Sequence, residues 1–193
     1  MKSSTELETE RLILRPWTLS DEDRAFFHFI LSDAEVRHFY PSRLSRNEAD
    51  EKLEEAVASH GNTDVDWGVA CLKSNGEPVG TTGLAHVNYE LPFTPCVEIG
   101  WLYHPKVWGQ GLATEAGNAL IQQGFEDVGL EEIVAFAVQD NHPSIAVMER
   151  IGMKRVIDGD FDHPGVPDSH AHLKRHVLYK ISADQWRDQA QTA

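Results

Sequence analysis

The segment that most constrains this chain is residues 103–116, YHPKVWGQGLATEA. Alternating apolar residues over 97–103 predict a strand, and apolar residues at helical spacing predict a helix over 110–125. Between them lie Gly109 and Gly111, which keep side chains out of the turn, so successive backbone N–H groups can point outward at the helix N-terminus. This arrangement suits a phosphate or pyrophosphate. A tight turn whose glycines only relieve the backbone is an open alternative.

The segment matches neither of two common nucleotide-binding motifs. A dinucleotide fingerprint, G-x-G-x-x-G, needs a third glycine where this chain has Thr114. A Walker loop needs a closing Gly-Lys-Ser or Gly-Lys-Thr, which the segment lacks. The two glycines therefore have to be interpreted with the elements around them.

Apolar periodicity predicts helices and strands in mixed order along the chain. Ser45 and Glu48 form a capping-box pattern, and Pro143 and Gly152 bracket a short helix. We expect strands at residues 10–17, 67–73, 77–85, 97–103, 132–138, 153–158 and 173–181, and helices after Ser20, after Ser45, over 110–125 and after Pro143. The order β-α-α-β-β-β-α-β-α-β-β predicts one mixed α/β domain over residues 1–193.

Composition excludes several classes of protein. The 193 residues carry 17 Lys+Arg against 31 Asp+Glu, a formal net charge of −14, which opposes an extended polyanion such as nucleic acid. Two cysteines imply no disulfide framework. No apolar run approaches the roughly 18 residues of a membrane span and no secretory leader is apparent, so we expect a soluble, cytoplasmic protein with no membrane partner.

Four segments together resemble the Gcn5-related N-acetyltransferase (GNAT) superfamily, in its ribosomal-protein-alanine acetyltransferase branch. They are TERLILR at 9–15, VEIGW at 97–101 with WGQGLATEA at 108–116, NHPSIAVMERIGM at 141–153, and LYKISADQW at 178–186. Within them, KVWGQG resembles the family's acyl-CoA loop, Q/R-x-x-G-x-G/A. The similarity spans residues 9–186, and the combined spacing is far more specific than any one motif.

The resemblance implies a GNAT fold in which two central strands splay apart and acetyl-CoA, the acyl donor, lies in the gap. It implies that one segment holds the pantetheine arm and the pyrophosphate through its backbone: Leu102, Tyr103, Lys106, Val107, Trp108, Gly109, Gln110, Gly111, Leu112 and Ala113. It also implies that Asn141 reaches the pantetheine arm and that Ser144 faces the thioester sulfur. Lys106 stands where the family usually has Gln or Arg, and a lysine meets phosphate as a point charge rather than a planar fork.

The resemblance also places Glu98 near the acceptor amine, where an ionised carboxylate could accept the ammonium proton directly or through water. An outward strand residue, or a partner for an arginine, is the alternative. Many family members have a tyrosine acid where this chain has Met148, which has no proton to give. That role then falls to Ser144, to water or to no group, since a thiolate of pKa about 8–9 can leave largely unaided; Ser144 as a simple helix-start residue is equally open. We expect Glu115, at the positive end of its helix, to be structural.

No metal is predicted. The acidic run DGDFD at 158–162 begins like an EF-hand loop, but His163 and Ser169 replace the required Gly and Glu. Four histidines at 163, 170, 172 and 176 lack a helical or cysteine partner, so we expect them on an exposed loop and strand.

We therefore predict an acetyl-CoA-dependent N-acetyltransferase that acts on a primary amine, a protein N-terminus or a small molecule, as a monomer or homodimer. The acceptor groove is expected among residues 37–46, 87–96 and 158–169. Aspartates in the last segment favour a cationic acceptor, and arginines in the first favour a carboxylate or the cofactor's phosphate. These residues are Asp158, Asp160, Asp162 and Asp168, and Arg37, Arg43 and Arg46. The missing tyrosine leaves open another class, an acyl-CoA-binding sensor or regulatory module without turnover.

Overall fold

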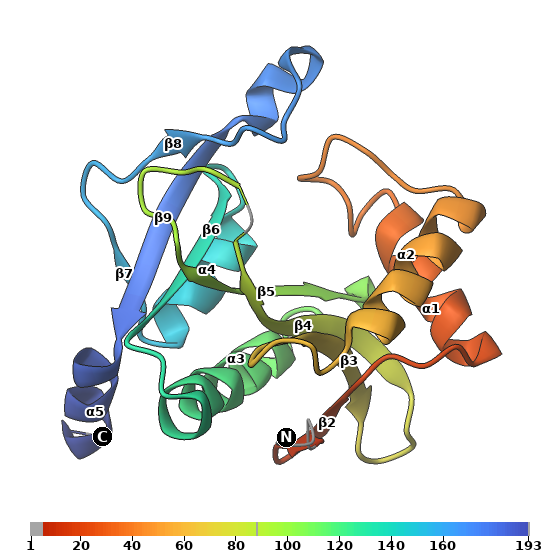
Figure 1. Ribbon diagram of the computed structural model, residues 1–193, viewed down its shortest axis with the longest axis horizontal. Helices are drawn as coiled ribbons and strands as arrows, with labels where there is room; N and C mark the ends of the chain where they lie inside the picture. Colours follow the sequence, from red (N-terminus) through yellow and green to blue (C-terminus); the bar gives the residue numbers. More distant parts are fainter. Residues whose placement is uncertain (1–5, 88, 193) are drawn as a thin grey trace.

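The computed structural model describes residues 6–87 and 89–192, with side chains up to residue 189. The described strands form one sheet in the order β1-β2-β3-β4-β5-β6-β9-β7, with β8 beside β9 (Figure 1). The strands are β1 Leu7–Glu8, β2 Leu12–Arg15, β3 Trp67–Leu72, β4 Pro78–His86, β5 Val97–Tyr103, β6 Glu132–Val138, β7 Lys154–Arg155, β8 Phe161–Asp162 and β9 Arg175–Ser182. The helices are α1 Asp21–Ser32, α2 Arg46–Ser59, α3 Leu112–Gln123, α4 His142–Arg150 and α5 Ala183–Thr192. This confirms the predicted mixed α/β class.

The centre of the sheet divides between β5 and β6. These strands run parallel and share a single register pair in the described chain, Glu98 with Val134. By contrast, β4 pairs with β5, and β9 with β6, along the full length of those two strands. Figure 1 shows β5 and β6 turning away from each other beyond the shared pair. The splayed central strands expected from the resemblance are confirmed.

Helices cover both faces of this sheet. Phe26 and Ile30 of α1 pack with Val69 and Cys71 of β3 in one apolar cluster. Ala70, between those two strand residues, joins a second cluster with α3 and α4, because alternate residues of a strand point to opposite faces. No helix in the described part of the chain is long and apolar enough to cross a membrane.

A buried ion pair fastens α1 to β2. Asp23 has no exposed surface, and its carboxylate accepts hydrogen bonds from both terminal guanidinium nitrogens of Arg15, at 2.8 and 2.9 Å. Its carboxylate also accepts the Thr18 backbone N–H at 2.8 Å and the Thr18 hydroxyl at 2.7 Å. Burial opposes ionisation of Asp23, but hydrogen bonds from Arg15 and Thr18 outweigh it and hold the pKa below its ordinary value. The pair sets the position of α1 and of residues 33–45 after it.

The region after α4 differs most from the sequence prediction. We predict a strand over 153–158, but only Lys154–Arg155 pairs as β7, because the chain turns at Asp158, whose φ is 60°. The expected loop contains β8 and a 3-10 helix, Asp168–Leu173, and the last strand covers 175–182 instead of 173–181.

Three further elements, α3, α5 and β1, also differ from the prediction. Helix α3 begins at Leu112 rather than at 110, because Gly111 adopts φ 79°, and it continues as a π-helical turn, Gly124–Val128. Helix α5 is absent from the prediction because its apolar pattern is sparse; Trp186 is its aromatic anchor, with ring centroids 5.7 Å from Phe125. Strand β1 is only two residues long and carries no periodicity.

We expect Asp23→Asn to lower the free energy of unfolding by about 3 kcal/mol, the low end for a broken buried pair, because Arg15 stays partly exposed. Urea denaturation measures this. Asp184→Asn, which breaks the exposed pair with Arg187, is the control and should cost about 0–1 kcal/mol. The contribution of the Asp23 carboxylate to the free energy of unfolding is complete above the pKa that it has in the unfolded chain, about 3.9. It is lost as the pH falls through the lower pKa of the folded chain. A loss below about 1 kcal/mol for Asp23→Asn would contradict the anchoring role.

Candidate functional site

A cavity of about 980 Å³ opens where β5 and β6 separate. Most of the residues predicted for the site border it. They are Leu102, Tyr103, Val107, Trp108, Gly109, Gln110, Gly111, Leu112, Ala113, Asn141 and Ser144. The two exceptions among the predicted residues are Lys106 and Glu98. The sequence therefore brings one loop, one strand end and one helix start to a common wall.

The loop before α3 presents backbone amides to this cavity. Gly109 and Gly111 adopt φ 73° and φ 79°, a left-handed conformation that favours glycine. Gly111 is the N-cap of α3 and supplies no side-chain hydrogen bond to the first turn, so these amides are available to a ligand. The Trp108 indole N–H donates to the Tyr103 carbonyl at 2.8 Å and fixes the loop on the end of β5.

Arg11 on the far side of the loop sets the direction of one of these amides. Its Nη1 donates to the Gln110 carbonyl at 2.9 Å, while its Nε pairs with Glu115 at 2.6 Å. In a trans peptide the C=O and the next N–H point in opposite directions, so the Gly111 N–H points away from Arg11. Gln110 and Gly111 border the cavity and Arg11 does not, so this N–H faces the cavity side.

Glu115 has the structural role that we predict for it. Besides Arg11, its carboxylate accepts the Thr9 hydroxyl at 2.6 Å and the Arg11 backbone N–H at 2.7 Å. Burial opposes its ionisation, but hydrogen bonds from Thr9 and Arg11 lower its pKa below the ordinary value. The start of α3 is thereby tied to the first residues of the sheet.

Lys106, the cation predicted for this loop, does not border the cavity. The Lys106 ammonium pairs with Glu77, and its backbone N–H donates to His104 Nδ1 at 3.1 Å. The cation that borders the cavity is Arg150, in the last turn of α4, with no acidic partner among the described residues. The sequence feature that could have identified Arg150 as a site residue is its place near the end of the 141–153 motif.

Residues of α4 and β5 form the inner wall. Asn141 caps α4 by accepting the Ser144 backbone N–H at 3.3 Å, and both border the cavity. Met148, on the same helix, is 2% exposed and belongs to the apolar core. The Tyr103 hydroxyl is buried without a hydrogen-bond partner in the described chain, and burial raises its pKa above the ordinary range.

Glu98 lies at the only register pair between β5 and β6 in the described chain. Val97 and Ile99 point into the core beneath α3, so Glu98 points to the opposite face, which carries α1 and α2. Burial raises the pKa of Glu98 to about 8, and no hydrogen-bond partner for its carboxylate occurs among the described residues. Burial, with a smaller contribution from the Glu98 charge, raises the pKa of Tyr40 and of Tyr89, so the two segments that carry these tyrosines lie within electrostatic reach of Glu98.

The turn after β7 contacts the loop before β5 through a side-chain hydrogen bond. The Tyr89 hydroxyl lies 3.0 Å from His163 Nε2, and burial, with a contribution from His176, lowers the pKa of His163 to about 4. The expectation that His176 is exposed is wrong, because it is 8% exposed among the aromatic rings of Phe136 and Phe161. No cluster in residues 6–87 and 89–189 could hold a metal ion.

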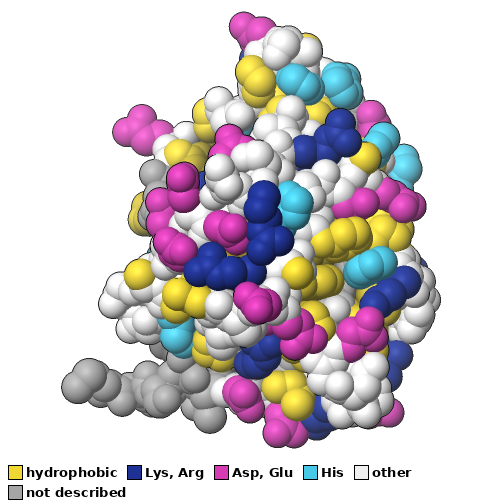
Figure 2. All heavy atoms as spheres, turned by 90° about the vertical axis from the view of Figure 1, so that its right-hand side faces the viewer, with side chains coloured by type: hydrophobic (Ala, Val, Ile, Leu, Met, Phe, Trp, Pro, Cys, Tyr) yellow, Lys and Arg dark blue, Asp and Glu magenta, His cyan; other side chains and the backbone are white. Residues whose placement is uncertain are grey.

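Ion pairs occupy most charges predicted for the acceptor groove. Three of the aspartates pair on their own turn: Asp160 with Arg155 at 2.5 Å, Asp162 with Arg175 at 3.3 Å, and Asp168 with Lys174. Arg46 pairs with Asp50 at 3.1 Å. Figure 2 shows the face with α1 and α2, where basic and acidic side chains stand interspersed.

The chain is similar to known proteins over most of its length. A family model described as an acetyltransferase (GNAT) domain matches residues 11–154. A Bacillus subtilis (strain 168) protein named uncharacterized N-acetyltransferase YnaD is 26% identical over 149 residues, covering 77% of this chain and 82% of YnaD. An Aspergillus fumigatus protein named FsC-acetyl coenzyme A-N(2)-transacetylase is 29% identical over 205 residues, covering 96% and 80%. The solved structure of a GNAT-family acetyltransferase from Bacillus anthracis superposes with a TM-score of 0.74 at 25% identity, covering 93% and 99%.

We expect the Glu98 carboxyl to titrate near pH 8, since burial raises its pKa to about 8. Carbon-13 NMR of labelled glutamate carboxyls measures the midpoint, and Glu98→Gln assigns the signal by removing it. A glutamate protonated when folded but ionised when unfolded loses stability as pH rises from about 4.3 to about 8. The stability of Glu98→Gln relative to the native chain should therefore increase over this interval. A midpoint near 4.3 would contradict the assigned burial.

Proposed function

The chain belongs to the acetyltransferase (GNAT) family, and on this premise we propose that it transfers the acetyl group of acetyl-CoA directly to a primary amine. The observation that carries this proposal is the cavity at the split between β5 and β6, with uncapped loop amides at its wall and Glu98 at the split. The Aspergillus relative, whose name includes acetyl coenzyme A, supports the choice of donor.

We assign the phosphates of acetyl-CoA to the loop before α3. Its uncapped amides suit an anion, and Arg11 holds the Gln110–Gly111 peptide with the N–H toward the cavity side. Arg150 adds a positive charge at the border. These local donors offset the repulsion that a phosphate meets from a chain of net charge −14.

The pantetheine arm fits the unpaired edge of β5. Leu102 and Tyr103 border the cavity there, and backbone groups beyond Glu98 have no strand partner on the β6 side in the described chain. Asn141 and Ser144 border the same cavity, and we assign Asn141 to the pantetheine arm and Ser144 to the thioester end.

Transfer needs a neutral amine, and Glu98 is the group we assign to deprotonate it. An ammonium beside Glu98 favours the ionised carboxylate, which takes the proton directly or through water. The amine nitrogen then attacks the thioester carbonyl carbon, the C–N bond forms, the C–S bond breaks to release the CoA thiolate, and the second proton of the attacking nitrogen passes to water or to the thiolate. Met148 has no proton to give, so Ser144 or water protonates this thiolate, or it leaves unprotonated.

A thiol-release assay with acetyl-CoA and a panel of amino acids, peptides, polyamines and aminoglycosides tests this function. We expect release above background with at least one amine, and kcat/KM rising as pH approaches about 8, the pKa of Glu98 in the free enzyme. Glu98→Gln should lower kcat about 10²- to 10⁴-fold and leave acetyl-CoA affinity unchanged. Glu55→Gln, on the exposed face of α2, is the control and should change neither. Tight acetyl-CoA binding without release for any amine would instead support an acyl-CoA-binding regulatory module, the candidate that Met148 favours.

The loop assignment has a separate test in two thioesters, acetyl-CoA and S-acetylpantetheine, which lacks the pyrophosphate. Arg11→Gln should raise the KM for acetyl-CoA about tenfold or more, because the Gly111 amide loses its fixed direction. The KM for S-acetylpantetheine should stay within about twofold, since nothing in that donor meets the loop. Arg187→Gln, on the exposed face of α5, is the control. Equal losses with both donors would mean that Arg11 supports only the fold, and no loss with either would contradict the loop assignment.

A further inference from the structure

We infer that the acceptor carries a carboxylate close to the amine that is acetylated, and that Arg37 binds this carboxylate. The inference rests on the proposed function and adds to it the chemical class of the acceptor. It depends on the Arg37 guanidinium, which stacks on Tyr40 of the cavity wall, and on the Glu98 carboxylate, which lies within electrostatic reach of the same tyrosine.

Arg37 is a half-buried cation without an acidic partner in the described chain. It lies between α1 and α2, with its guanidinium carbon 3.6 Å from the centroid of the Tyr40 ring and its Nε donating to the Ser42 carbonyl at 3.3 Å. Burial lowers its pKa below the ordinary value, and no carboxylate raises it again. A guanidinium withdrawn from water gains most from a carboxylate that can accept its fork of N–H groups.

Its surroundings distinguish Arg37 from the other arginines of the same segment. Arg46 is already paired with Asp50 at 3.1 Å, and Arg43 is exposed to solvent. Glu35 borders the cavity too, but it forms no ion pair with Arg37. The cation at Arg37 is thus left for a ligand.

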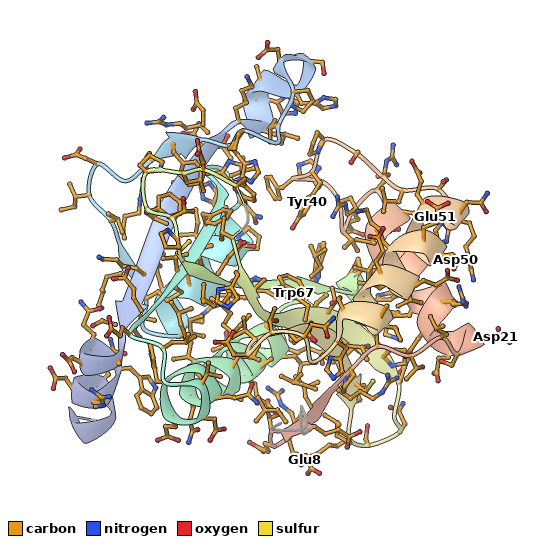
Figure 3. All side chains as sticks on the ribbon, viewed as in Figure 1. Glu8, Asp21, Tyr40, Asp50, Glu51 and Trp67 are labelled. Carbon is orange, nitrogen blue, oxygen red and sulfur yellow. The ribbon has the colours of Figure 1, made fainter. Side chains whose placement is uncertain are left out.

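Tyr40 links Arg37 to the amine end of the site. Figure 3 shows Tyr40 on the segment between α1 and α2, pointing away from α2 toward the half of the molecule that carries β6 and β9. Its ring borders the cavity, stacks with Arg37, and lies within electrostatic reach of Glu98. A guanidinium and a carboxylate of the protein thus both act on this tyrosine. An acceptor with an ammonium and a carboxylate a few bonds apart, as in an α-amino acid, matches this pair of charges.

The charges nearby do not favour a polycation. Three of the four aspartates in the acidic turn after β7 are paired with cations, including Asp160 with Arg155 and Asp162 with Arg175. A polyamine or aminoglycoside would meet Glu35 at the cavity border and Glu98 at the split, and would be repelled by Arg37. Most of the acidic charge that suggests a cationic acceptor in the sequence is therefore already paired in the structure.

Acceptors that differ only in the carboxylate test this inference. We would compare L-amino acids with their α-amides and with the corresponding decarboxylated amines in the thiol-release assay. We expect kcat/KM to be about tenfold or more higher for the acids. The amine of an amide ionises at lower pH than that of the acid, so amine basicity favours the amide and cannot produce the preference over amides. The decarboxylated amines are more basic than the acids, so their kcat/KM is compared per concentration of neutral amine.

Substitution of Arg37 supplies the second arm. Arg37→Gln should bring the ratio of acid to amide close to one by lowering kcat/KM for the acids only, and Arg37→Lys should retain part of the preference as a point charge. Arg43→Gln, on the same segment, should leave the ratio unchanged. Turnover of amides or polyamines as fast as acids in the native chain, or a preference that survives Arg37→Gln, would overturn the inference and leave the proposed function intact. Acetyl-CoA binding without release for any amine would overturn both.

Discussion

The separation of β5 from β6 is the constraint on which the rest of the structure depends. Two parallel strands that meet at Glu98 and Val134 and then diverge leave backbone groups of the central sheet without a strand partner. Such an opening is tolerated only if the strands are held firmly on their outer sides, and β4 and β9 pair with them along their full length. The end of β5 at the opening is where the glycine loop begins, so cavity, loop and helix N-terminus follow from one divergence.

The parts of this arrangement that depend on local sequence could be predicted. Apolar periodicity located the main strands and helices, and the glycine pair located the loop, because φ 73° and φ 79° suit glycine wherever the chain lies. Most residues predicted for the cavity wall lie in one continuous segment, from the end of β5 to the start of α3, while Asn141 and Ser144 were placed at the wall by the resemblance. The strand predicted over 153–158 was too long, because the chain turns at Asp158. This residue has a left-handed φ although it is not a glycine, so nothing in the sequence signals the turn.

Side-chain pairings over long sequence distances could not be predicted. Lys106 was the nearest cation in sequence to the loop, yet its ammonium turns to Glu77, and the loop carbonyl of Gln110 is held instead by Arg11, 99 residues away. Arg46, by contrast, pairs with Asp50 four residues further along α2, a local pair of the kind that sequence can predict. The net charge of −14 describes the whole chain and not the site, because it does not tell which carboxylates lie beside a cation.

The contacts of Glu115 make the first residues of the sheet part of the ligand loop. Thr9 and Arg11 reach this carboxylate across 106 and 104 residues of sequence, so the edge strand and the loop order each other. Any ligand that orders the loop must by thermodynamic reciprocity also hold β2 in the sheet, and slower amide hydrogen exchange there would be its signature. During synthesis the order is inverted: the edge strand emerges first and gains this anchor only when α3 has been made. The first residues of the sheet are thus secured by a helix that is translated 104 residues later.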